Sequence, residues 1–265
     1  MKVAAVVPAR YHSTRLPGKP LADIAGEPMI RWVYERARRA LSVDEVWVAT
    51  DDERICEAVR RFGGNCRMTS SHHQSGTDRL AEIAEGMDWD FVINVQGDEP
   101  LLDPSMVTQV INCLKKNPAV SMATLKCKIT STSEITNPNV VKVVTDTDGC
   151  ALYFSRAPIP FNRDLRRTVH GIASDLPLSV FKHIGLYAYQ RNFLLRFSQL
   201  EPTPLEKIER LEQLRALEYG YKIKVATSES STIGVDTAED LERVRAIVKS
   251  KGISCNPEHS EENIV

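Results

Sequence analysis

The first 130 residues alternate between two kinds of segment, and this alternation restricts the fold more than any other feature of the sequence. Apolar, β-branched segments at 2–9, 45–50 and 90–95 predict buried strands, and periodic segments between them predict amphipathic helices. Such a chain forms a mostly parallel sheet with helices on both faces. Ligands bind these sheets beyond the carboxyl ends of the strands. Three polar loops follow strands there, namely 10–19, 51–52 and 96–100.

The pattern changes after about residue 137. Two strand-like segments surround a turn, a proline-rich stretch follows, and 204–219 predicts one helix. We interpret 137–220 as an α+β lobe inserted into the core, to which the final strand and helix return. The prediction is therefore one domain over 1–250 that carries this lobe, with a polar tail at 251–265.

Charge and hydropathy exclude several classes of protein. The 34 basic and 35 acidic side chains leave a net charge of −1, whereas a general nucleic-acid binder needs a basic field. The longest run without a charged residue is 104–114, which is far shorter than the ~20 residues of a membrane-spanning helix. The amino-terminal segment lacks the long apolar region of a secretory signal. We therefore expect a cytoplasmic protein that binds neither nucleic acid nor membrane.

The cysteines and histidines show no metal-binding spacing. No CxxC or HxxxH pair occurs among the six cysteines and six histidines. The cysteines lie in segments that predict buried strands and helices, where a free thiol is commonly a small core residue. We expect all six to be reduced, as is usual in the cytosol. They are Cys56, Cys66, Cys113, Cys127, Cys150 and Cys255.

The first polar loop, PARYHSTRLPGKP, concentrates positive charge. Arg10, Arg15 and Lys19 lie within ten residues, and no acid precedes Asp23. Arginine binds phosphate oxygens in pairs and lysine acts as a point charge, so the loop suits a polyphosphate, with Ser13 as a neutral donor. The sequence matches neither GxxxxGK[ST] nor GxGxxG. A solvated basic loop is the alternative, but its place after a buried strand favours a phosphate site.

A second candidate segment, HQSGTDR, begins a predicted helix. Gly76 allows close approach of the backbone, and Gln74 and Ser75 supply the donors and acceptors that read a base edge. Alone, such a segment is more often a simple helix cap. Beside the first loop, it predicts a wall that recognises the base.

Two aspartates are candidates for a magnesium site. Asp98 ends the strand DFVINV within Gln-Gly-Asp-Glu-Pro, and Asp236 precedes a capping-box-like Thr237. Carboxylates together with substrate phosphates are the ligands that Mg²⁺ prefers. The alternative is that both simply cap helices, and the residues alone leave open whether the two carboxylates meet.

The inserted segment adds weaker candidates. Arg156 lies between a strand and a proline and could hold a carboxylate, although a surface ion pair is the alternative. His183 opens a strand and is, taken alone, more often structural. Glu212 and Gln213 lie off the leucine stripe of the predicted helix, where most charges belong to a solvated face.

Together these segments resemble the 3-deoxy-manno-octulosonate cytidylyltransferase family over residues 3 to about 248. The resemblance rests on VVPARYHSTRLPGKPL, HHQSGTDRLAE, VINVQGDEPLL, ALYFSRAPIP, HIGLYAY and GVDTAEDLERV, among others, in one order. It implies a nucleotide-diphospho-sugar transferase-like (Rossmann-like) fold and a homodimer formed through the lobe. It also implies Mg²⁺-dependent transfer of CMP from CTP to 3-deoxy-D-manno-octulosonate (Kdo), with release of pyrophosphate, for lipopolysaccharide biosynthesis. The stretch 161–182 is variable in such proteins, and the tail lies outside the pattern.

The resemblance also implies a role for each candidate residue. Arg10, Ser13, Arg15 and Lys19 would hold the triphosphate, with Lys19, Arg15, Asp98 and Asp236 as the catalytic set. Gln74, Ser75, Gly76 and Arg79 would read cytosine and ribose, and Asp98 and Asp236 would bind magnesium. The sugar pocket would consist of Gln96, Arg156, His183, Tyr187, Glu212 and Gln213.

Three other interpretations remain open at this point. A related cytidylyltransferase could act on 8-amino-Kdo or sialic acid, since these pockets share residue types. A nicotinamide oxidoreductase would fit the alternating sheet but would need GxGxxG. A non-catalytic nucleotide-binding module would have no need of both aspartates.

Overall fold

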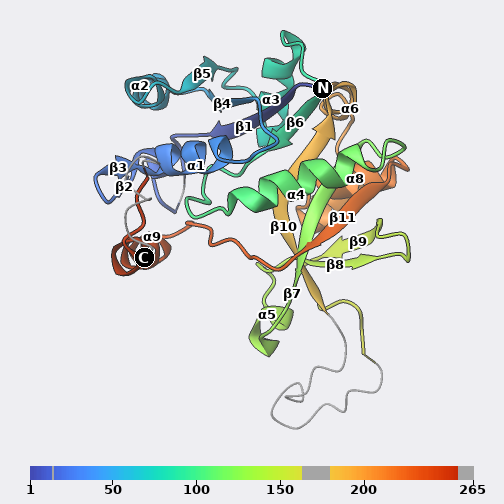
Figure 1. The fold of residues 1–265 in the computed structure, drawn as a ribbon. Coiled ribbons are helices and arrows are strands. Elements are labelled where there is room, and N and C mark those ends of the chain that lie inside the picture. The colour runs from blue at the N-terminus through green and yellow to red at the C-terminus, as the bar shows by residue number, and fades with distance from the viewer. Residues whose placement is uncertain (14, 163–179, 256–265) are drawn as a thin grey trace.

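The computed structural model describes residues 1–13, 15–162 and 180–255. Its central sheet has the strand order β11-β7-β10-β6-β1-β4-β5, as Figure 1 shows. β10 runs antiparallel to both of its neighbours, and every other pair along this order is parallel. The strands are β1 (Val3–Ala9), β4 (Glu45–Thr50), β5 (Asn65–Met68), β6 (Phe91–Asn94), β7 (Met122–Lys128), β10 (Phe181–Gln190) and β11 (Ile223–Ser228). The predicted mostly parallel sheet is confirmed.

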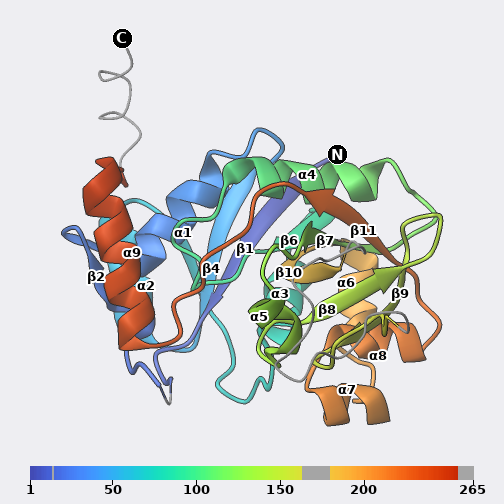
Figure 2. The ribbon, with the colours of Figure 1, turned by 90° about the horizontal axis from the view of Figure 1, so that it is seen from below.

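Helices cover both faces of this sheet, as Figure 2 shows. On one face α1 (Met29–Arg38), α2 (Glu53–Arg61) and α4 (Pro104–Lys115) share a buried apolar cluster with the sheet. On the other face α3 (Gly76–Glu85) and α6 (Arg191–Phe197) do the same. Strand β1 is buried along nearly its whole length because both of its faces are covered. Within the described ranges, no helix is both long and apolar enough to cross a membrane.

Short elements complete the fold. A 3₁₀ turn, η1 (Lys19–Leu21), and the hairpin β2 (Asp23–Ile24) and β3 (Glu27–Pro28) lead into α1. The predicted hairpin of the 137–220 segment is present as β8 (Lys142–Thr145) and β9 (Ala151–Ser155). The remaining helices are α5 (Thr132–Thr136), α7 (Pro204–Glu209), α8 (Gln213–Glu218) and α9 (Ala238–Lys251).

Strand β10 ties the 137–220 segment to the core. It lies between β7 and β6 in the central sheet, and β8 joins it through the pair Lys142 and Lys182. The buried Lys142 Nζ donates to three backbone carbonyls of the segment, at 2.6 to 3.0 Å. The division of the chain into a core and an inserted lobe stays a prediction. Most of the 161–182 stretch and most of the predicted tail lie outside the described residues.

The helix predicted over 204–219 is wrong, because the chain breaks into α7 and α8. Arg210 has a φ of 53°, in the left-handed region that ends a helix. The guanidinium of Arg156 binds the backbone at this break, because its Nε donates to the carbonyl of Glu209 at 2.7 Å. The Glu209 carboxylate also accepts from the Arg156 amide at 2.9 Å. This tertiary contact outweighs the helical periodicity of the segment.

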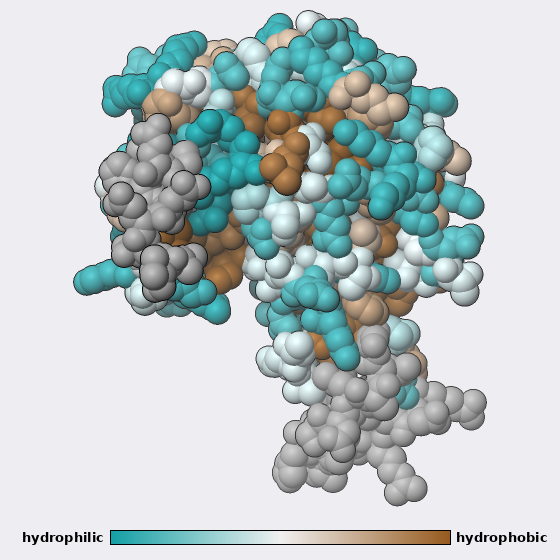
Figure 3. Space-filling view, in the orientation of Figure 1, coloured by the Kyte–Doolittle hydropathy of each residue, from teal (hydrophilic) through white to brown (hydrophobic). Residues whose placement is uncertain are grey.

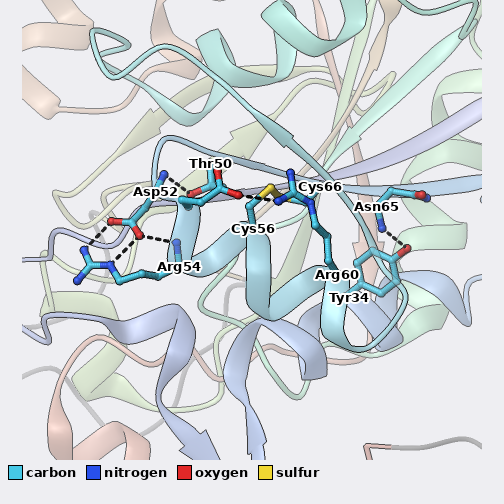
Figure 4. Close-up of a disulfide and its surroundings, with 9 residues drawn as sticks. Tyr34, Thr50, Asp52, Arg54, Cys56, Arg60, Asn65 and Cys66 are labelled. Atoms are coloured by element: carbon cyan, nitrogen blue, oxygen red, sulfur yellow. Dashed lines mark hydrogen bonds and ion pairs between the residues drawn. A yellow bond between two sulfur atoms is a disulfide. The ribbon is translucent and has the colours of Figure 1, made fainter.

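The prediction of six reduced cysteines is wrong for one pair. Cys56 on α2 and Cys66 on β5 form a disulfide, shown in Figure 4. Helix α2 packs directly on the edge strand that follows it, so a separation of only ten residues brings the two sulfur atoms together. Cys113, Cys127, Cys150 and Cys255 are free.

We expect reduction of this disulfide to lower the free energy of unfolding by about 2–3 kcal/mol, because cross-linking a loop of this length restricts the unfolded chain. Urea unfolding with and without dithiothreitol measures the difference. The Cys56→Ser/Cys66→Ser double variant is the matched control and should show no response to the reductant. Equal stability of the oxidised and reduced wild-type protein would contradict the assignment.

Candidate active site

A cleft of about 1,030 Å³ lies at the carboxyl ends of β1 and β6. The sequence predicts ligand binding at this edge of the sheet. The lining of the cleft includes residues near α5 and the start of α9, and Figure 3 shows the surface hollowed between these two parts. The predicted site residues that line it are Arg15, Gly76, Gln96, Asp98, Arg156, His183, Tyr187, Glu212, Gln213 and Asp236. The others, Arg10, Ser13, Lys19, Gln74, Ser75 and Arg79, lie beside or behind this lining.

Lys19 joins the two predicted metal aspartates. Its ammonium nitrogen lies 2.8 Å from Asp98 Oδ2 and 3.2 Å from Asp236 Oδ1. The guanidinium of Arg15 lies 3.1 Å from the same Asp236 oxygen. The Lys19 side chain is only 15% exposed, so solvent screens these pairs less than it screens a surface pair. The two carboxylates therefore do meet, although 138 residues separate them in the chain.

Backbone geometry brings these groups together. Gly18 adopts a φ of 69°, and its amide donates to the carbonyl of Tyr11, which folds the first loop back toward β1. A side chain at Gly97 would lie 2.8 Å from the carbonyl oxygen of Pro8, so only glycine lets the loop after β6 pass this close to β1. Asp98 is thereby placed beside the first loop.

The donor set at this point fits magnesium. Asp98 and Asp236 supply two carboxylates, and among the described residues no group of three or more histidines, cysteines or acids gathers as a metal centre. Mg²⁺ commonly takes one or two carboxylates and completes its octahedron with water and substrate phosphates. A pair of aspartates in an open cleft matches this pattern, whereas a structural zinc site would require four protein ligands.

The first loop contacts the base-recognition segment. Arg10 Nη2 donates to the carbonyl of His73 at 3.1 Å, and Ser13 Oγ accepts from the amide of Leu16. The side chains of Arg10 and Arg15 are largely exposed. These two guanidinium groups lie beside a cleft whose lining also holds acidic side chains such as Asp98.

The segment around Ser75 begins α3 with a capping box. Ser75 Oγ accepts from the amide of Asp78, whose carboxylate accepts from the Ser75 amide in return. The helix cap that the alternative interpretation predicts is therefore present at the start of α3. Gly76 also packs against Pro8, because an added Cβ would lie 3.1 Å from that ring. The exposed Gln74 bonds only locally, to the carbonyl of His72.

Arg79 follows this segment on α3 and is not among the residues that line the cleft. Its side chain is 1% exposed and is paired with Asp51 at 2.6 Å. It also donates to Thr69 Oγ1 and to the carbonyl of Ser70. The role that the geometry supports is to hold the 69–75 loop in place.

His183 lines the deeper part of the cleft on β10. Its Nε2 lies 3.0 Å from Thr124 Oγ1, and its ring packs edge-on against Phe154 with centroids 5.0 Å apart. Burial lowers the pKa of His183 to about 3. The imidazole is therefore neutral at physiological pH, where it can exchange hydrogen bonds but supplies no charge.

A bulge in β10 sets the direction of these side chains. The register with β7 shifts between Ile184 and Tyr187, and Thr124 Oγ1 lies within 3.0 Å of the Ile184 and Leu186 carbonyls. Gln96 Nε2 donates to the carbonyl of Gly185 at 3.0 Å, so this predicted sugar residue also holds the bulge. Burial raises the pKa of the adjacent Tyr187 well above its ordinary value, and its phenol stays protonated.

Glu212 and Gln213 follow the break between α7 and α8. Thr77 donates its hydroxyl to Glu212 Oε2, and burial raises the pKa of this carboxyl. Within the described residues, Glu212 Oε1 and Gln213 Nε2 are buried without a hydrogen-bond partner. Because such atoms are costly unless satisfied, they mark positions for ligand groups.

The Arg156 guanidinium makes several hydrogen bonds to the backbone that the sequence does not predict. Its guanidinium donates to the carbonyls of Glu209, Pro138 and Arg210, at 2.7, 2.9 and 3.4 Å. It still lines the cleft, and these three contacts leave two of its five N–H groups for an anionic ligand.

Sequence reasoning missed two buried polar residues of the cleft. Asn94, at the end of β6, is 4% exposed, and its Oδ1 has no partner within the described residues. Glu99 is 8% exposed, and burial, reinforced by the charge of Asp98, raises its pKa to about 7. A polar residue that ends an otherwise apolar strand was the available signal for Asn94.

Known proteins were compared with this chain. A family model described as Cytidylyltransferase matches residues 4–223. A relative from Geotalea daltonii, named 3-deoxy-manno-octulosonate cytidylyltransferase, is 54% identical over 95% of this chain and 100% of its own length. One of the same name from Geobacter sulfurreducens is 54% identical over 92% of this chain and 98% of its own. The chain belongs to the 3-deoxy-manno-octulosonate cytidylyltransferase family.

Solved structures agree with this membership. The structure of CMP:2-keto-3-deoxy-manno-octonic acid synthetase complexed with CTP has a TM-score of 0.87 and 45% identity, and the match covers 95% of this chain and 100% of that one. A cytidylyltransferase from Leptospira borgpetersenii, at 18% identity and a TM-score of 0.62 over 96% of this chain and 89% of its own, shows the shared fold alone. The family resemblance and the predicted fold are thus confirmed. This cytidylyltransferase is an enzyme of the nucleotidyltransferase class, so the oxidoreductase interpretation is wrong.

The neutral His183 predicts a specific pH dependence of stability. Below about pH 6.5 the unfolded chain binds a proton at this residue that the folded cytidylyltransferase does not bind, so the free energy of unfolding falls as pH decreases. We expect His183→Gln to reduce that slope by up to about 1.4 kcal/mol per pH unit between about pH 6 and 4.

Urea unfolding of the ligand-free protein at several pH values measures this slope. His72→Gln, at an exposed histidine, is the matched control and should retain the wild-type slope. The same slope in the wild-type protein and the His183 variant would contradict a neutral buried imidazole.

Proposed function

We propose that this protein transfers CMP from CTP to Kdo, giving CMP-Kdo and pyrophosphate, and so activates Kdo for lipopolysaccharide biosynthesis in the cytoplasm. The observation that carries the proposal is the Lys19 ammonium between Asp98 and Asp236, at the end of a parallel sheet where nucleotides bind. The names of the relatives, and the CTP with which the similar solved structure is complexed, support the two substrates.

The first loop would hold the triphosphate. Three cations and a hydroxyl lie on this loop beside the cleft, from Arg10, Arg15, Lys19 and Ser13. They suit the proposed substrates because both substrates are anionic. In the reaction, the anomeric oxygen of Kdo forms a bond to the α-phosphorus of CTP while the bond to the departing pyrophosphate oxygen breaks. The hydroxyl proton is lost to solvent or to a phosphate oxygen. Arg15 and Lys19 would stabilise the pyrophosphate as it leaves.

Asp98 and Asp236 would hold Mg²⁺. When bound, the ion would offset the charge of the phosphates and lower the pKa of the attacking hydroxyl. The Lys19 ammonium keeps the two carboxylates close despite their mutual repulsion. Gln74, Ser75 and Gly76 would face the cytosine and ribose across from them. Arg79 would act behind these three residues by holding their loop.

The sugar would occupy the β10 side of the cleft. This side of the cleft is lined by Gln96, Arg156, His183, Tyr187, Glu212 and Gln213. The unpartnered atoms of Glu212 and Gln213 suit sugar hydroxyls, and Arg156 is a cation in the lining that could bind the Kdo carboxylate. The residue types leave 8-amino-Kdo and sialic acid as alternative substrates. A panel of the three sugars with CTP, followed by pyrophosphate release, decides among them.

Replacing either aspartate should stop turnover. Asp98→Asn and Asp236→Asn keep the side-chain volume but remove a carboxylate, so we expect the rate to fall by on the order of a hundredfold or more. Pyrophosphate release from CTP, Mg²⁺ and Kdo measures the rate, and circular dichroism checks folding. Asp148→Asn, in the exposed β8–β9 turn, is the matched control. A variant rate near that of the wild type would overturn the metal assignment.

We also propose a homodimer formed through the 137–220 segment. Leu152 on β9 is 61% exposed and Ile208 on α7 is 79% exposed, and a contact between two protomers there would remove apolar surface from water. We expect Ile208→Asp to shift the protein from dimer to monomer in size-exclusion chromatography with light scattering. Leu41→Asp changes a leucine outside the segment that is 96% exposed, and it should leave the dimer intact. A monomeric wild-type protein would contradict the proposal.

A further inference from the structure

We propose that Glu99 is a positioning residue that, through Thr232, pins the strap formed by residues 229–237 and so holds Asp236 beside Asp98. The inference rests on the proposed function, because it concerns the same two aspartates. It assigns a task to a buried carboxyl that the proposed reaction does not use.

The strap has to cross a wide gap. It leaves β11 at one end of the sheet and reaches α9 beside the β2–β3 hairpin, as Figure 2 shows. Residues 229–237 contain no helix or strand, so no ladder of backbone hydrogen bonds fixes their path. Asp236 lies near the far end of this segment. Its position relative to Asp98 therefore depends on the individual contacts that the strap makes.

Three hydrogen bonds tie the strap to the segment that follows β6. Ser230 Oγ donates to Asp103 Oδ2 at 3.1 Å, and Thr232 Oγ1 donates to Glu99 Oε1 at 2.9 Å. The amide of Val235 donates to the carbonyl of Asp98 at 2.9 Å. The last of these bonds joins the residue next to Asp236 directly to Asp98. The Glu99 tie is the middle one of the three.

Glu99 is costly to keep in its place. Its side chain is 8% exposed, and its Oε2 has no hydrogen-bond partner within the described residues. A buried carboxyl with so few partners destabilises the fold. We therefore expect this residue to serve a purpose other than stability. Capping α4 is not that function, because Asp103 caps this helix through the amide of Ser105. Its other carboxylate oxygen accepts from Thr232, and this contact joins Glu99 to the strap.

The test measures the position of the strap without any substrate. Hydrogen–deuterium exchange at the Val235 amide reports its bond to Asp98, and titration calorimetry with MgCl₂ reports the metal affinity of the two aspartates. In Thr232→Val, which removes the hydroxyl and keeps the shape, we expect exchange at Val235 to rise and the affinity for Mg²⁺ to fall, each about three- to tenfold. Glu99→Ala should behave in the same way.

Two further variants separate positioning from general destabilisation. Glu99→Gln retains a side-chain oxygen that can accept from Thr232, so we expect near-wild-type exchange and affinity. Thr227→Val, at an exposed position on β11, is the matched control and should change neither. The kinetic counterpart is a raised Mg²⁺ requirement for pyrophosphate release, with a smaller change in the rate at saturating Mg²⁺.

Unchanged exchange at Val235 in both Thr232→Val and Glu99→Ala would overturn the proposal. An even rise across β11 and the strap, with no selective effect at Val235, would also overturn it, because it would mean only a loss of global stability. If the protein proves inactive on CTP and Kdo, the proposed function fails, whereas the exchange result still decides whether Glu99 pins the strap.

Discussion

The ammonium of Lys19 is the contact on which the cleft depends. Two carboxylates held this close repel each other, and the positive charge between them makes the arrangement favourable. Each partner comes from a different structural unit, since Lys19 begins η1, Asp98 follows β6 and Asp236 precedes α9. One partly buried cation thus links the first loop, the centre of the sheet and the last helix.

An antiparallel strand completes the cleft on the other side. Because β10 runs against its neighbours, its amino-terminal half lies at the edge where the parallel strands have their carboxyl ends. His183 is thereby opposite Lys126 and Tyr187 opposite Asn94, within reach of the loops after β6 and β1. A continuous parallel sheet would have placed these residues at the middle or the far edge. The bulge held by Thr124 and Gln96 then adjusts their direction.

The sequence allowed the sheet to be predicted, and it singled out Asp98 and Asp236 as candidates without showing that they meet. Alternating apolar segments define the strands, and Asp98 lies in the polar loop that follows β6. Three features left no such signal because they depend on tertiary contacts. The pairing of Arg79 with Asp51 joins the start of α3 to the loop after β4. The helix predicted over 204–219 is interrupted where Arg156 binds its backbone, and Cys56 meets Cys66 only because α2 packs on β5.

Unsatisfied polar atoms connect the stability of the fold with its function. Asn94 Oδ1, Glu99 Oε2, Glu212 Oε1 and Gln213 Nε2 are buried without partners in the described part of the chain, and all four residues line the cleft. Each such atom costs about 1–3 kcal/mol in a folded protein. A ligand that satisfies some of them recovers part of this cost on binding and stabilises the fold by mass action. A polar ligand that bonds to these atoms would therefore stabilise the folded protein.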